Sequence, residues 1–322
     1  MNVMMKYILM LFPVVLCAVY HYVTVWAQGG VCNSTAMMGG KVVVITGANT
    51  GIGKETARDL VRRGAEVHML CRDEEKGETA KRDIESETGG EVFVHKIDLA
   101  SLESVRECAR ELVDQLDKID ILVNNAGVMA TPERRTKEGF ELQFGTNHVG
   151  HFLLTTELLP LLRRAGNARV VVVSSSAHAM GPIQFDDLNW RSRPYSSLAA
   201  YGQSKLANIL FAKELARRES LLGSGVTTYS VHPGIVRTEL SRHVKETFGT
   251  AFFILAQLFL PLYKTVENGA QTSICCAVDT GLQGQTGKYY KDCQEAINSP
   301  EADNMEDAKK LWEMTQLMVT SA

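Results

Sequence analysis

The chain has 322 residues, of which 45% are hydrophobic and 22% are charged, as expected for a folded protein with a sizeable core. Its formal net charge of −3 and its scattered Lys and Arg residues argue against nucleic-acid binding, so we expect no nucleic-acid partner. The seven cysteines form no C-x-x-C pair, so we predict neither a zinc site nor any other metal and no disulfide framework.

The N-terminal segment 7–27 contains no Asp, Glu, Lys or Arg and has about the 20 residues that a membrane-spanning helix needs. Tyr20, Tyr22 and Trp26 lie near one end of it, as in an interfacial aromatic belt. We predict a retained membrane anchor over residues 1–28. A cleaved signal peptide, with cleavage near Ala27, is the alternative.

Residues 29–40 are rich in small side chains and are predicted to be a linker.

The charges around the apolar segment indicate its orientation in the membrane. Lys6 precedes the apolar segment and no charge follows it until Lys41, which favours a cytosolic N-terminus. Asn33 begins an N-S-T sequon, which matters only if this side of the membrane is luminal; an unused sequon is the favoured interpretation.

Beyond Lys41, short β-branched runs alternate with segments of helix length. The expected strands are 42–46, 66–71, 91–97, 120–124, 169–174 and 226–231, and the expected helices are 51–63, 74–88, 101–116, 138–163 and 199–220. Apolar strands separated by helices indicate a parallel sheet covered on both faces. We predict an α/β, doubly wound Rossmann fold and a single catalytic domain over residues 41–322.

The first predicted strand runs directly into a glycine-rich turn with Gly47, Gly51 and Gly53. Glycines at a strand-to-helix turn allow positive φ and let backbone amides approach a pyrophosphate, which then lies at the positive end of the helix dipole. The position of this turn favours dinucleotide binding over a tight turn without a ligand.

The second predicted strand indicates which dinucleotide is bound. An acidic residue usually holds the ribose 2′-hydroxyl of NAD at this place, but Cys71 and Arg72 occupy it, with Asp73 one step later. Arg72 can meet a 2′-phosphate, and Lys54 beside the glycine turn can add positive charge. We therefore predict NADP(H); Arg72 as an exposed residue at a helix start is the alternative.

Tyr201 and Lys205 lie four residues apart on one face of the last predicted helix. A neighbouring cation would stabilise a phenolate and lower the tyrosine pKa, but the spacing alone does not identify a catalyst. The alternative is a lysine whose stem packs beside a half-buried tyrosine.

In order along the chain, these motifs resemble those of the short-chain dehydrogenase/reductase family, and the resemblance covers nearly everything from Lys41 to about residue 295. The motifs are T-G-x-x-x-G-I-G at 46–53, Asp98-Leu99, N-N-A-G at 124–127, Asn147, Ser175, Y-x-x-x-K at 201–205, Pro233-Gly234 and Thr238. Within the family, the chain is similar to the membrane-anchored, NADPH-dependent retinol dehydrogenases.

The resemblance implies a role for each matching residue. Tyr201 would be the general acid/base, Lys205 would hold the nicotinamide ribose, Ser175 would donate to the substrate oxygen, and Asn147 would hold a proton-relaying water. Cofactor contacts are implied for Gly47, Asn49, Thr50, Gly51, Ile52, Gly53, Arg72, Asp98, Leu99, Asn125, Ala126, Gly127, Tyr201, Lys205, Pro233, Gly234 and Thr238. The asparagine that often precedes the catalytic serine is missing from the sequence VVSS at 172–175.

The apolar run 248–263, broken by Pro261, is short for a membrane span. It is either a core helix or a flap that lines a lipid-substrate pocket at the bilayer surface. With the anchor, it suggests a hydrophobic substrate from the membrane.

The leading hypothesis is therefore an NADP(H)-dependent enzyme that interconverts retinal and retinol. Alternatives are a family member acting on steroids or lipid-derived aldehydes and, less favoured, a catalytically silent cofactor-binding protein. The resemblance implies the endoplasmic reticulum membrane, with a mitochondrial membrane as the alternative, and it leaves a homodimer open.

Overall fold

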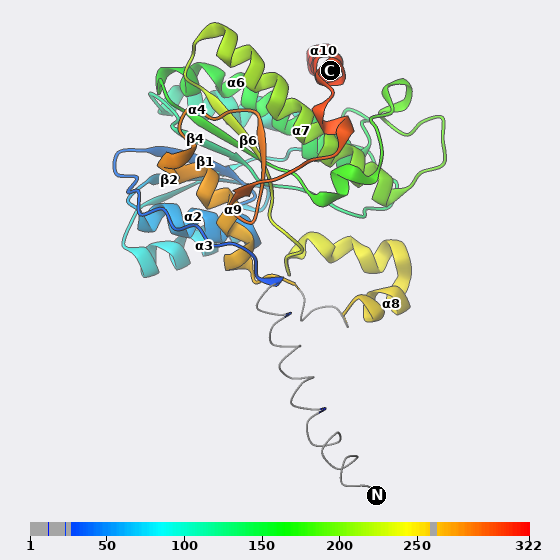
Figure 1. Cartoon of the computed structure of the whole chain (residues 1–322), viewed down its shortest axis with the longest axis horizontal. Helices are drawn as coiled ribbons and strands as arrows, with labels where there is room; N and C mark the ends of the chain where they lie inside the picture. The colour runs from blue at the N-terminus through cyan, green and yellow to red at the C-terminus, as the bar shows by residue number, and fades with distance from the viewer. Residues whose placement is uncertain (1–11, 13–22, 24–26, 258–262) are drawn as a thin grey trace, which may run out of the picture.

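The computed structural model describes residues 12, 23, 27–257 and 263–322 (Figure 1). Within these residues, one eight-stranded sheet has the order β3-β2-β1-β4-β5-β6-β7-β8. Strands β1 to β7 pair in parallel and β8 pairs antiparallel with β7. The strands are β1 (Val42–Thr46), β2 (Glu66–Cys71), β3 (Val92–Lys96), β4 (Ile121–Asn124), β5 (Arg169–Val173), β6 (Thr227–His232), β7 (Lys288–Lys291) and β8 (Gln294–Glu295).

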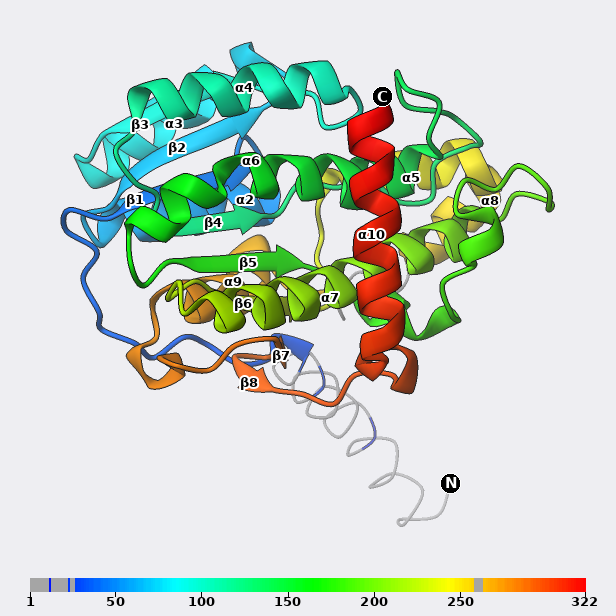
Figure 2. The same cartoon turned by 90° about the horizontal axis from the view of Figure 1, so that it is seen from above.

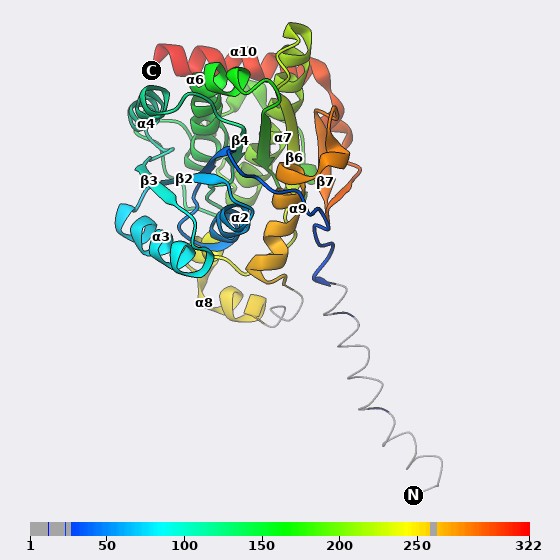
Figure 3. The ribbon, with the colours of Figure 1, turned by 90° about the vertical axis from the view of Figure 1, so that its left-hand side faces the viewer.

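Helices cover both faces of this sheet (Figure 2). The helices are α2 (Gly51–Arg62), α3 (Glu74–Thr88), α4 (Leu102–Gln115), α5 (Leu142–Phe144), the π-helix η1 (Gly145–Val149), α6 (Gly150–Arg164), α7 (Ser197–Leu222), α8 (Val244–Gln257), α9 (Val266–Val278) and α10 (Met305–Ser321). Short 3₁₀ turns are η2 (Ser176–Met180), η3 (Phe185–Asp187), η4 (Glu239–His243), η6 (Thr280–Leu282) and η7 (Pro300–Asp303). Helices α2, α3 and α9 lie on one face and α4, α6 and α7 on the other, with α10 packed against α7 (Figures 1 and 3).

The alternation of side chains along each strand builds the two cores. In β1, Val43 and Ile45 join the cluster beneath α2, α3 and α9, whereas Val44 joins the cluster beneath α4, α6 and α7. Successive side chains of a strand point to opposite faces, so a strand buried on both faces must be apolar throughout. The continuous runs of Val and Ile in the sequence have this cause.

The predicted doubly wound Rossmann fold is confirmed. All six expected strands form, with bounds within two residues of those expected. The expected helix over 138–163 forms as one continuous helical stretch of α5, η1 and α6, which begins at Leu142 and contains a π-helical turn that was not predicted. Elements after β6, namely α9, β7, β8 and α10, were not predicted from the sequence.

The predicted linker packs along the surface of the α/β fold. The amide of Cys32 donates to Gln271 Oε1 of α9 at 3.0 Å, and Arg63 Nη1 at the end of α2 donates to the carbonyls of Ser34 and Ala36 at 2.8 and 2.9 Å. The segment is therefore held by specific contacts to α2 and α9. The predicted anchor falls outside the described residues except at positions 12, 23, 27 and 28. None of the helices in the described part of the chain has the length and apolar character needed to cross a bilayer.

Candidate active site

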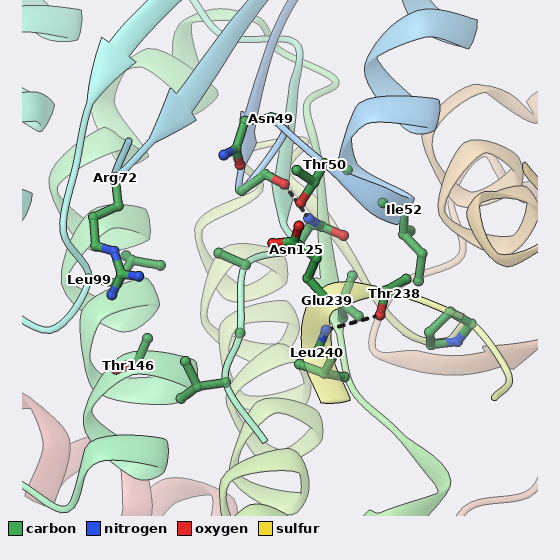
Figure 4. A pocket seen from close by; sticks show the side chains of 18 of the residues that line it. Asn49, Thr50, Ile52, Arg72, Leu99, Asn125, Thr146, Thr238, Glu239 and Leu240 are labelled. Atoms are coloured by element: carbon green, nitrogen blue, oxygen red, sulfur yellow. Dashed lines mark hydrogen bonds between the residues drawn. The ribbon is translucent and has the colours of Figure 1, made fainter. Parts of the chain in front are cut away.

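The order of the strands reverses between β1 and β4, and a cavity opens at the carboxyl ends of these strands. In an open α/β sheet such a reversal point leaves a crevice where ligands bind. Figure 4 shows Arg72 and Leu99 on one side of this cavity and Thr238 and Leu240 on the other. Residues from the glycine turn after β1, from β2, β5 and α7, and from the loop after β6 therefore face one common space.

The glycine turn after β1 has the backbone that a phosphate site requires. Gly47 and Gly51 have φ values of 65° and 58°, which favour glycine. At Gly53 a Cβ atom would lie 2.4 Å from both Asn125 Nδ2 and the Gly47 carbonyl, so no side chain fits there. Thr50 precedes α2 without a side-chain cap, and the first turn of α2 has no acidic residue. The N-terminal N–H groups of α2 are thus free to bind an anion.

Thr46, the last residue of β1, fastens this turn to the end of β4. Its Oγ1 accepts hydrogen bonds from the amides of Asn125 and Ala126 at 2.9 and 3.0 Å, and Asn125 Nδ2 donates to the Thr46 carbonyl at 2.9 Å. The Asn125 side chain therefore shapes the wall of the cavity by binding the backbone of β1.

At the end of β2, Arg72 lines the cavity and forms no ion pair with any residue that the structure describes. Lys54 does not contribute as expected, because its Nζ pairs with Asp83 Oδ2 at 2.8 Å and it does not line the cavity. Asp98 and the buried Leu99 form the neighbouring wall, and Asp98 Oδ1 accepts the amide of Ala100 at 3.0 Å. Of the two basic residues predicted from the sequence, only Arg72 remains available.

Tyr201 and Lys205 lie together on α7 at the inner end of the cavity, only 5% and 3% exposed. Lys205 Nζ donates to the Val173 carbonyl at 3.0 Å and lies 5.6 Å from the centre of the Tyr201 ring. Ser175, one residue beyond the serine that follows β5, hydrogen-bonds to the Tyr201 hydroxyl. The phenol, the hydroxyl and the ammonium group thus meet at one point of the cavity.

Burial sets the charge states of this group. It raises the pKa of Tyr201 to about 12, and the hydrogen bond from Ser175 opposes this rise. It lowers the pKa of Lys205 to about 8. The expected lowering of the Tyr201 pKa by Lys205 is therefore wrong for the protein itself. Desolvation of the buried phenolate is the largest cause of the rise in this pKa. Tyr201 carries its proton at neutral pH.

Asn147 does not line the cavity and instead supports its wall from within η1. Its Oδ1 accepts the amide of Val128 at 2.8 Å, and its Nδ2 donates to the Val128 carbonyl and to Ser204 Oγ, both at 2.9 Å. These contacts engage the whole side-chain amide, so the side chain holds the strand-end loop and α7 together.

The cavity unites every predicted site residue except Asn147. It also includes residues that were not predicted, among them Thr146, Lys76, Glu239 and Arg242. Thr146 Oγ1 is buried and has no hydrogen-bond partner within the described structure. The adjacent Asn147 could have drawn attention to Thr146, but no motif in the sequence marks Arg242.

The sequence model of the short chain dehydrogenase family matches residues 41–248. The chain belongs to the short-chain dehydrogenase family. This short-chain dehydrogenase is 50% identical over 288 residues to retinol dehydrogenase 12 of Homo sapiens, with 89% of each chain covered. Its family and its similarity to retinol dehydrogenases identify it as an oxidoreductase.

Solved structures agree with this assignment. The crystal structure of an uncharacterized protein from Mycobacterium paratuberculosis has a TM-score of 0.74 and 38% identity, covering 91% of this short-chain dehydrogenase and 98% of the other chain. The active-site complex of RhlG with NADP from Pseudomonas aeruginosa has a TM-score of 0.62 and 26% identity, covering 83% and 98%.

Proposed function

We propose that this short-chain dehydrogenase uses NADP(H) to interconvert retinal and retinol, with Tyr201 as the general acid/base. The observation that carries the proposal is the single cavity that unites the glycine turn and Arg72 with Ser175, Tyr201 and Lys205. Relatives named retinol dehydrogenase, about half identical over most of both chains, support a retinoid substrate.

The residues present fit a phosphorylated dinucleotide. The uncapped N-terminus of α2 suits the pyrophosphate, and Arg72 stands where an NAD-binding chain would place a carboxylate. The similar RhlG structure holds NADP in its active site, which supports the same cofactor here. When bound, the nicotinamide would exchange a hydride with the carbonyl carbon of the substrate.

The side chains of the protein would manage the proton and the developing charge. Tyr201 would donate its proton to the carbonyl oxygen during reduction and take it back during oxidation. Ser175 would donate a hydrogen bond to the same oxygen as negative charge develops there. Lys205, held by the Val173 carbonyl, would keep a positive charge beside the phenol and orient the nicotinamide ribose. The raised pKa of Tyr201 means that it would have a proton to donate at neutral pH.

We also propose a membrane location for the enzyme and a role for each segment of the chain. Residues 1–28 would anchor it in the endoplasmic reticulum membrane, residues 29–40 would connect the anchor, and residues 41–322 would form the catalytic domain. The apolar run 248–263, which overlaps α8 and residues outside the described part, would face the bilayer and admit a lipid substrate.

A substrate panel tests this proposal on the full-length protein in detergent. All-trans-retinal, nonanal and a ketosteroid would each be supplied with NADPH or NADH, and kcat/KM would be measured for each pair. We expect the highest value for retinal with NADPH. A ketosteroid or nonanal as the preferred substrate would assign the enzyme to steroids or lipid-derived aldehydes instead. Tight NADPH binding without turnover of any carbonyl would indicate a catalytically silent protein.

A further inference from the structure

Two arginines from distant parts of the sequence line the same cavity. Arg72 follows β2 and Arg242 lies in η4, the 3₁₀ turn between β6 and α8. Neither guanidinium group forms an ion pair with a carboxylate in the described part of the chain. The Nη1 atom of Arg242 donates a hydrogen bond of 3.3 Å to the Glu239 carbonyl, which holds the side chain beside the cavity.

The lysines near this end of the cavity each have a carboxylate beside them. Lys54 Nζ pairs with Asp83 at 2.8 Å, and Lys76 Nζ approaches Asp73 Oδ2 at 3.9 Å. Arg72 and Arg242 are therefore left as a pair of like charges.

The two guanidinium charges repel each other. Partial burial and the charge of Arg72 both lower the pKa of Arg242, and the nearby Glu239 opposes them more weakly. An anion that carries more than one charge and lies between two like-charged side chains offsets the repulsion between them. A guanidinium group also matches the geometry of phosphate oxygens.

We propose that Arg242 and Arg72 together bind the 2′-phosphate of NADP(H), so that the loop after β6 contributes to cofactor specificity. The inference rests on the proposed function and names a second phosphate-binding residue for it. The pyrophosphate is a less suitable partner for Arg242, because the free N–H groups of α2 serve the pyrophosphate and the strongest charged neighbour of Arg242 is Arg72. Since η4 leads directly into α8, the 2′-phosphate would also hold this loop against the sheet.

Equilibrium binding to the full-length protein tests the inference without turnover. Dissociation constants for NADPH and NADH would be measured by fluorescence titration for the wild type and for Arg242→Ala. We expect NADPH binding to weaken about tenfold, which corresponds to about 1.4 kcal/mol, with NADH binding changed by no more than about twofold. Arg242→Lys, which retains the charge and loses the planar fork, should fall between these values.

Arg237→Ala is the matched control. Arg237 is exposed, belongs to the same loop and does not line the cavity, so its removal makes the same change in net charge. We expect both dissociation constants to stay at the wild-type values. An equal loss in this control would show a general charge effect and overturn the inference.

Two further outcomes would contradict the proposal that Arg242 and Arg72 together bind the 2′-phosphate. If Arg242→Ala weakened the binding of NADPH and NADH equally, Arg242 would contact a group that both cofactors share. If NADPH binding were unchanged, Arg242 would not contact the cofactor. Either result leaves the proposed function intact if the wild type still prefers NADPH and reduces retinal. A wild type that binds NADH more tightly than NADPH would instead contradict the proposed cofactor itself.

Discussion

Lys205 shows how burial prepares a single side chain for its role. Its ammonium group is 3% exposed and donates to the Val173 carbonyl at 3.0 Å, and burial lowers its pKa to about 8. The group is therefore charged at neutral pH but loses its charge within the mildly alkaline range. Tyr201, with a pKa raised to about 12, keeps its proton throughout that range.

This difference predicts the pH dependence of retinal reduction. The kcat/KM value, which reports the free enzyme, should be level near pH 7 and fall as the pH rises through about 8, because Lys205 becomes neutral. In Lys205→Arg the remaining activity should lack this decline, since a guanidinium group stays charged. Initial rates from pH 6 to 10 check the prediction. A wild-type profile that stays level to pH 10 would contradict the role of Lys205.

At the scale of elements, the wall of the cavity depends on the π-helix η1. Glu141 accepts the amides of Gln143 and Phe144 at 2.9 and 2.7 Å, and this starts the short helix α5. The helical register then changes at η1, where Asn147 reaches both backbone groups of Val128. His151 Nδ1 donates to the Asn147 carbonyl at 2.9 Å, because a carbonyl can only accept.

Loss of the Asn147 amide should destabilise the whole domain. Asn147→Ala would leave the buried amide and carbonyl of Val128 without partners, at a cost of about 2–4 kcal/mol in the free energy of unfolding. Urea denaturation of the variant and the wild type gives this difference. The exposed Asn33 offers a control, since Asn33→Ala should leave the stability unchanged. A variant at Asn147 with wild-type stability would show that the bonds to Val128 contribute nothing.

The same elements show why sequence patterns predict some features and miss others. Strands such as β1 were predicted within a residue because a strand buried on both faces requires a continuous apolar run. The π-helix η1 was missed because the apolar pattern of the segment does not mark it, and its Asn147 binds Val128, which lies 19 residues away in the sequence. Arg242 was missed because its position beside Arg72 arises only from the fold of the loop after β6. The motif residues were predicted through the family resemblance, and their roles remain a proposal.

For the whole molecule, hydrogen bonds join the described end of the N-terminal segment to the chain just before α9. The side chain of Gln28 accepts the amide of Thr265 at 3.0 Å and donates to the Tyr263 carbonyl at 3.3 Å. The last residue of the predicted anchor therefore contacts the residues just before α9. An anchor at residues 1–28 would therefore end beside the apolar run 248–263, the segment proposed to admit the substrate.

Buried histidines predict how the stability of the whole protein depends on pH. Burial lowers the pKa of His148 to about 3 and of His151 and His232 to about 4, whereas an unfolded chain has values near 6.5. Below about pH 6.5 the unfolded state binds more protons, so the free energy of unfolding falls as the pH drops towards 4. Each histidine should contribute about 1 kcal/mol of loss between pH 7 and 5.5.

Urea denaturation at pH 7 and 5.5 checks this expectation. Carboxylates with lowered pKa values, such as Asp120 and Glu214, cost stability only at lower pH and so do not confuse the comparison. Equal free energies of unfolding at both pH values would contradict the assignment of these histidines as neutral in the folded protein.

The most direct measurement compares the wild type with Tyr201→Phe in single-turnover reduction of all-trans-retinal, with NADPH binding measured on the same samples. We predict that the variant binds NADPH with wild-type affinity and reduces retinal at least about a hundredfold more slowly, because only the proton donor is lost. A variant that reduces retinal at the wild-type rate would contradict the assignment of Tyr201 as the acid/base.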